Sequence, residues 1–135
     1  MKHFIVVLLL VFITGCQWKT DPIKLKPITL SEAYPESILE VDRIELLDGS
    51  TGERKVIEDQ QVIMQFLSEV KDIVLEPDEN QEGRAGYVFG ISLYKGKEVK
   101  LGFIPNQINK IYYKTNIEFV GHVKAFFEEH FEREF

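Results

Sequence analysis

Residues 87–113 read YVFGISLYKGKEVKLGFIPNQINKIYY, and large apolar side chains occupy every second position in the first part of this run. The alternating residues are Tyr87, Phe89, Ile91 and Leu93, and after Lys95-Gly96-Lys97 they are Val99, Leu101 and Phe103. A period of two, broken by a glycine turn, is typical of paired β-strands. Pro105-Asn106 then turns the chain into an expected third strand, about 108–113. The run predicts an antiparallel meander.

The segments on either side of the meander have the period of an α-helix. Apolar residues of 62–74 fall on one side of a helical wheel, and Asp59 is placed to cap the first turn. Residues 117–131 repeat the pattern, with glutamates on the opposite side. The expected buried residues are Val62, Ile63, Phe66, Leu67, Val70, Ile73 and Val74 in the first helix, and Phe119, Val120, Val123, Phe126, Phe127 and Phe131 in the second.

Upstream, residues 41–47 and 53–57 flank the turn Asp48-Gly49-Ser50-Thr51-Gly52, which predicts a β-hairpin. The element order is therefore β-β-α-β-β-β-α. This order predicts an α+β fold, a two-layer sandwich in which both helices pack on one face of an antiparallel sheet. We expect residues 38–135 to form this single domain.

The N-terminus has the organisation of an export signal. Lys2 and His3 precede an unbroken apolar run, residues 4–13, and small residues Thr14 and Gly15 precede Cys16, the single cysteine of the chain. The alternative is a transmembrane anchor, but a helix needs about 20 apolar residues to cross a bilayer, and this run is shorter. We expect residues 1–15 to be a signal peptide.

Residues 13–16, Ile-Thr-Gly-Cys, resemble the lipobox of bacterial lipoproteins. With a short spacer and one compact α+β domain, the whole pattern resembles small lipoproteins of low-GC Gram-positive bacteria. The resemblance implies that Cys16 is the lipidation site, joined to diacylglycerol, and that cleavage occurs just before it. It also implies a cell-membrane protein, lipid-anchored and facing outside the cytoplasm.

Residues 16–37 carry three prolines and show no sustained periodicity, which predicts an extended tether of on the order of 60 Å. The spacing of Ile23, Leu25, Ile28 and Leu30 would also allow part of this segment to dock on the domain.

The charge of the processed chain limits its partners. Removing residues 1–15 leaves 120 of the 135 residues, takes away one of the 16 basic side chains and none of the 22 acidic ones, and so changes the formal charge from −6 to −7. An acidic chain without a Lys/Arg cluster argues against nucleic acid and anionic headgroups, so membrane contact is expected through the acyl chains on Cys16 alone. With Cys16 acylated, no thiol remains for a disulfide or a thiolate metal site, and no cofactor is expected.

Candidate metal and anion sites are weak in the sequence. His122 and His130 are two helical turns apart, too far to share a metal in the usual one-turn arrangement. We expect His122 to be a surface residue, and His130 to be partly buried, with either a local hydrogen bond or a charge that the helix C-terminus favours. Asp78, Asn80 and Glu82 match only the first half of an EF-hand loop, which favours a solvated, mobile loop and no bound metal. The 48–53 turn would either cradle an anion or simply close the hairpin.

Aromatic residues gather near the C-terminus, where Phe119, Phe126, Phe127, Phe131 and Phe135 follow Tyr112 and Tyr113. Core packing is the first interpretation. The alternative is an apolar partner patch formed by Tyr112, Tyr113, Phe131 and Phe135.

The sequence contains an anchor and a sheet-based domain without an assembled catalytic set. It therefore favours a non-enzymatic interaction module that binds an envelope protein or peptide. An inhibitor or immunity-type lipoprotein against an exported enzyme or toxin is the first alternative, because an acidic surface suits a basic target. The second alternative is an envelope enzyme dependent on carboxylates such as Asp42, Glu45 or Glu53.

Overall fold

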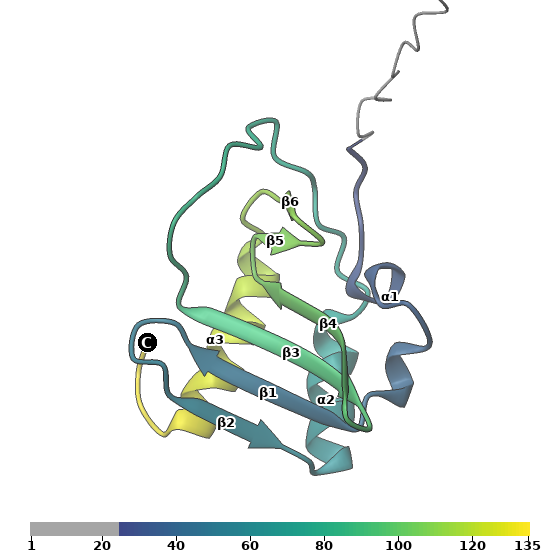
Figure 1. The fold of residues 1–135 in the computed structure, drawn as a ribbon, viewed down its shortest axis with the longest axis vertical. Coiled ribbons are helices and arrows are strands. Elements are labelled where there is room, and N and C mark those ends of the chain that lie inside the picture. The colour runs from purple at the N-terminus through teal and green to yellow at the C-terminus, as the bar shows by residue number, and fades with distance from the viewer. Residues whose placement is uncertain (1–24) are drawn as a thin grey trace, which may run out of the picture.

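The computed structural model describes residues 25–135, and the expected signal peptide, Cys16 and the first part of the tether lie outside them. Six strands form one antiparallel sheet in the order β2-β1-β3-β4-β5-β6. The strands are β1 (Arg43–Asp48), β2 (Arg54–Ile57), β3 (Phe89–Lys95), β4 (Glu98–Ile104), β5 (Gln107–Ile108) and β6 (Ile111–Tyr112). Helices α2 (Gln60–Val70) and α3 (Ile117–Phe131) lie on one side of it (Figure 1). The predicted α+β fold is confirmed.

The core fills the space between the sheet and these two helices. Alternate residues of β1 are buried, and the same alternation in β3 and β4 turns their large apolar side chains toward the helices. Phe66 of α2 stacks on Phe126 of α3 with ring centroids 4.0 Å apart. Within residues 25–135, none of the helices is long and apolar enough to span a bilayer.

Side-chain caps fix where both long helices begin. The Asp59 carboxylate accepts hydrogen bonds from the backbone N–H groups of Gln61 and Val62, at 2.9 and 3.2 Å, as predicted. Asn116 does the same for Phe119 at 3.0 Å. Helix α2 ends earlier than its apolar arc, so Val74 lies outside it and is exposed rather than buried. Val120 is only half-buried.

The strand expected at 108–113 is instead a tight hairpin. Strands β5 and β6 have two residues each, and Asn109 and Lys110 between them have φ of 51° and 67°. Two successive left-handed residues form the kind of turn whose twist matches paired strands. The prediction of one continuous strand was therefore wrong, because the turn residues were assigned to the strand.

The segment before β1 packs on the domain, so the boundary expected at Ile38 is wrong. It contains helix α1 (Leu30–Ala33) and the 3-10 turn η1 (Ile38–Glu40). Leu30 is fully buried and Tyr34 is 3% exposed. The N–H groups of Ile28 and Leu75 each donate to the other's carbonyl, at 3.0 and 2.8 Å. Docking, the alternative for this segment, is what the structure shows from Ile28 onward.

Candidate functional site

The outer face of the sheet, opposite α2 and α3, contains an open hollow of about 420 Å³, which we call the sheet hollow. Its floor comes from positions that alternate with the buried core residues. Leu47 pairs with Gly90 across β1 and β3, Ser92 pairs with Gly102 across β3 and β4, and Ile104 pairs with Gln107 across β4 and β5. The hollow therefore crosses most of the sheet.

Two glycines line this hollow and have different effects. A Cβ at Gly90 would lie 3.0 Å from the Tyr87 ring and 3.3 Å from the Leu47 Cβ, so this glycine allows the ring to lie against the strand. A Cβ at Gly102 would lie 3.9 Å from the Ser92 hydroxyl, an ordinary contact. Gly102 also has no positive φ. Neither backbone conformation nor packing demands glycine at 102, and its effect is to leave space on the sheet.

The charged side chains lining the sheet hollow are Arg54 and Lys110, although the chain as a whole is acidic. The Arg54 guanidinium forms an ion pair with Glu45. Lys110 has no ion pair among the residues that the structure describes, and it stands on the left-handed turn between β5 and β6. The lining of the hollow thus has one cation that is paired with a carboxylate and one exposed cation without such a pair among the described residues.

A second hollow, the helix groove, lies between α2 and α3 and measures about 390 Å³. Its floor includes Phe66 and Phe126, which are only 2% and 6% exposed because they stack on each other. Its rim carries Glu69, Glu129 and His122. The groove is therefore acidic at the rim, and its aromatic floor is already largely covered.

The two histidines occupy different environments. His122 is at the surface, as expected, with Nδ1 3.2 Å from a carboxylate oxygen of Glu69. The His130 ring packs edge-on against Phe126 at 4.4 Å. Its Nε2 is buried and has no hydrogen-bond partner within residues 25–135, so the expected local hydrogen bond is not formed at that atom.

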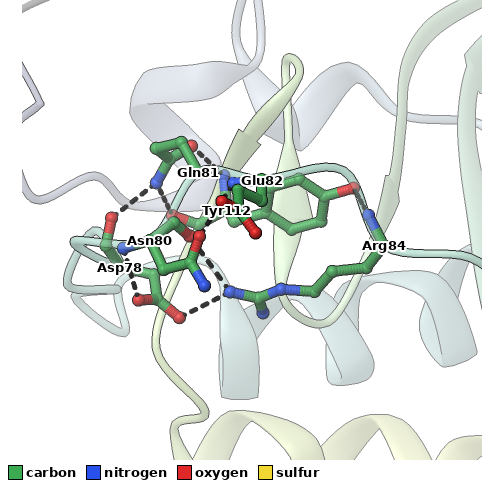
Figure 2. A network of polar contacts seen from close by, with 6 residues as sticks. All are labelled: Asp78, Asn80, Gln81, Glu82, Arg84 and Tyr112. Carbon is green, nitrogen blue, oxygen red and sulfur yellow. Dashed lines mark hydrogen bonds and ion pairs between the residues drawn. The ribbon is translucent and has the colours of Figure 1, made fainter.

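The acidic loop is held by a network of polar contacts (Figure 2). Gln81 donates to the carbonyls of Asp78 and Tyr112, at 2.6 and 2.8 Å, and accepts from the Tyr112 N–H at 2.9 Å. The Arg84 guanidinium donates to the Asp78 carboxylate at 2.7 Å and stacks on the Tyr112 ring at 4.6 Å. This hydrogen bond from Arg84 lowers the pKa of Asp78. Arg84 thus supplies the positive charge that a cation would have supplied.

No group of three or more His, Cys, Asp or Glu side chains in residues 25–135 is arranged to hold a metal ion. The carboxylates named as catalytic alternatives have separate partners. Asp42 accepts from the N–H of Gly96 at 2.9 Å, Glu45 pairs with Arg54, and Glu53 lies 3.6 Å from Lys55. The structure therefore does not join them in one site.

The turn at 48–53 closes the hairpin, and the anion that it binds is a carboxylate of the same turn. The Asp48 carboxylate accepts from the Ser50 N–H and hydroxyl, at 2.8 and 2.6 Å, and pairs with Arg133. The Ser50 hydroxyl is the main cause of a strongly lowered pKa at Asp48, and the hydrogen bond from Arg133 adds to it against the opposing effect of burial. An external anion would have to displace this carboxylate.

The four residues of the expected partner patch pack against the rest of the protein and do not form an exposed surface. Tyr112, Tyr113 and Phe131 are 7%, 3% and 8% exposed. Phe135 packs against the rings of Phe89, Phe127 and Phe131, at 5.5 to 5.7 Å. The tyrosines lie at the β6 end of the sheet and the C-terminus lies near the β1–β2 turn (Figure 1). The core-packing interpretation fits these positions, and the patch does not form.

The sequence did not single out the residues of the sheet hollow. The sequence feature that could have indicated this hollow is the set of small residues, Gly90, Ser92 and Gly102, that alternate with the apolar positions of the two central strands. Small residues on one face of a strand indicate space or a close approach on that face. Comparison of the chain with protein-family models, curated proteins and solved structures found no match.

Proposed function

We propose that this protein is a lipid-anchored, extracytoplasmic binding module whose ligand lies in the sheet hollow. The observation that carries the proposal is the outer face of the sheet, hollowed over Gly102 and bordered by polar side chains. Concave sites with an apolar floor and a few polar groups are typical of ligand sites. The sequence supports the anchor through the lipobox-like residues 13–16.

The folded start of the domain changes the expected distance from the membrane. Leu25 follows Cys16 by nine residues, which reach at most about 30 Å when fully extended. That is half of the expected tether length. We propose that the domain is held close to the outer surface of the membrane, where its ligand would be a membrane or envelope component.

The lining of the sheet hollow supports binding rather than chemistry. The described residues that line it include no Asp, Glu, His or Cys. The nearest carboxylate across the sheet is Glu45, which pairs with Ser92 in the β1–β3 register, but its side chain forms an ion pair with Arg54 and is not free to activate Ser92 as a nucleophile. The remaining groups of the hollow, a tyrosine, amides, two cations and apolar side chains, are suited to recognition.

A pair of glycine substitutions tests the proposal. Gly102→Val projects a side chain into the sheet hollow where a Cβ is tolerated, and valine favours a strand, so stability should be equal or higher. Gly121→Ala is the matched control. Gly121 belongs to α3, away from the sheet hollow, and a Cβ there would have no atom within 4 Å. In the native host, cross-linking should recover a partner with the parent and Gly121→Ala but not with Gly102→Val. A partner held equally by all three chains would contradict the proposal.

The helix groove favours a second candidate, the inhibitor or immunity-type lipoprotein. Glu69 and Glu129 at its rim would suit a basic exported enzyme or toxin. Glu129→Lys should then weaken capture of that target while Gly102→Val leaves it unchanged. The opposite pattern supports the sheet hollow instead.

A further inference from the structure

We infer that the sheet hollow receives a short extended peptide segment whose carboxylate pairs with Lys110. This inference rests on the proposed function, since it specifies the ligand of the same hollow. Three features of the hollow lead to it: its charge, the backbone at Lys110, and the length and chemistry of its floor.

The charge of the hollow is opposite to that of the chain. Both charged side chains in its lining are cations, in a protein with a formal net charge of −6. Glu45 already compensates Arg54, and Lys110 has no carboxylate partner within the described part of the chain. An incoming carboxylate would therefore form its strongest contact at Lys110.

The backbone at Lys110 is unfavourable for lysine. Its φ of 67° is left-handed, and the second position of such a turn is usually glycine. Glycine would form this turn with less strain. What lysine adds at this position, compared with glycine, is a side chain that ends in an ammonium group. Strained residues of this kind occur often at binding sites, and here the residue lies on the rim of a hollow.

The floor suits a peptide better than a phosphate polymer. Leu47 and Ile104 supply apolar contact, Ser92 supplies a hydroxyl, and Gly102 leaves room for a main chain to approach. From β2 to β5 the sheet spans four strand spacings, about 19 Å, which corresponds to about six residues of extended peptide. A phosphodiester polymer would present repeated charges, and one uncompensated lysine cannot neutralise them.

The test uses the full-length protein in detergent micelles and a displayed library of heptapeptides. We expect the selected peptides to carry Asp, Glu or a free terminal carboxylate. A synthetic selected peptide should bind about tenfold more weakly to Lys110→Gly, as expected for loss of a charge-assisted hydrogen bond. Lys110→Arg keeps the charge and should keep binding. Lys97→Gly, which removes an exposed cation outside the hollow, should have no effect.

Thermal melting separates a structural role of Lys110 from a binding role. Because glycine relieves the left-handed strain, Lys110→Gly should melt at the same temperature as the parent or higher. Selection of peptides without acidic groups, or equal affinity of a selected peptide for the parent and Lys110→Gly, would overturn the inference. The proposed function would survive that result if Gly102→Val still blocked binding of the selected peptides. Binding of a glycerol-phosphate polymer instead of any peptide would also overturn it.

Discussion

Arg133, two residues beyond the end of α3, forms an ion pair with Asp48, the last residue of β1, whose side chain is fully buried. The pair links residues 85 positions apart and ties the C-terminus to the first hairpin. The Arg133 guanidinium also lies 4.1 Å from the centroid of the Phe135 ring. The last residues are therefore part of the fold.

This pair predicts acid sensitivity. Because the pKa of Asp48 is lower in the folded chain than its unfolded value of about 3.9, its contribution to stability is complete above that value. The contribution is lost as the pH falls below about 4 toward the folded pKa. Melting curves from pH 7 to pH 2 should show a larger drop for the parent than for Asp48→Asn, which is less stable at neutral pH. Parallel curves for the two proteins would refute this role.

Phe127 and Phe135 test the aromatic cluster at the end of α3. Phe127 is fully buried, and Phe127→Ala should lower the free energy of unfolding by about 3–5 kcal/mol through the cavity it leaves. Phe135 is only partly buried but contacts three other rings, so Phe135→Ala should cost about 1–2 kcal/mol. Urea denaturation measures both. A Phe135→Ala chain as stable as the parent would mean that the Phe135 ring is not packed.

Leu30 tests the start of the domain. Its side chain is fully buried, and Leu30→Ala should cost about 2–5 kcal/mol. A chain beginning at residue 25 should melt like the longer chain, whereas one beginning at residue 38 loses Leu30 and Tyr34 and should be markedly less stable. Equal melting of the two truncations would restore the boundary at Ile38.

Cys16 tests the proposed anchor. Without a thiol no acyl chain can be attached, so Cys16→Ala should lose incorporation of a labelled fatty acid and leave the membrane fraction. The Gly121→Ala chain, changed far from the N-terminus in sequence, serves as the labelled control. Label retained on the Cys16→Ala chain would rule out lipidation at this position.

The strands and helices with long, regular patterns could be predicted from the sequence. Helix α3 has the predicted bounds because its apolar period persists for four turns and Asn116 caps it. The β5–β6 hairpin could not be predicted, because Asn109-Lys110 lacks the glycine that usually marks such a turn. Whether residues 28–34 pack on the domain could not be decided from the sequence either, because their burial depends on contacts with Lys71 and Leu75, more than 35 positions away.

The sheet hollow depends on tertiary structure even more strongly. The small residues of β3 and β4 were visible in the sequence, but which face of the sheet remains uncovered is decided by where α2 and α3 pack. Lys110 comes to the rim only because the chain reverses at Asn109. Local patterns carry no record of that reversal.

The binding surface itself is tested most directly by amide chemical shifts of the ¹⁵N-labelled full-length protein in micelles, titrated with a selected acidic peptide. If the sheet hollow is the site, shifts should be largest at Gly90, Ser92 and Gly102 and should disappear in Gly102→Val. Shifts confined to the helix groove, around Gln65 and Ala125, with the sheet unchanged, would contradict the account.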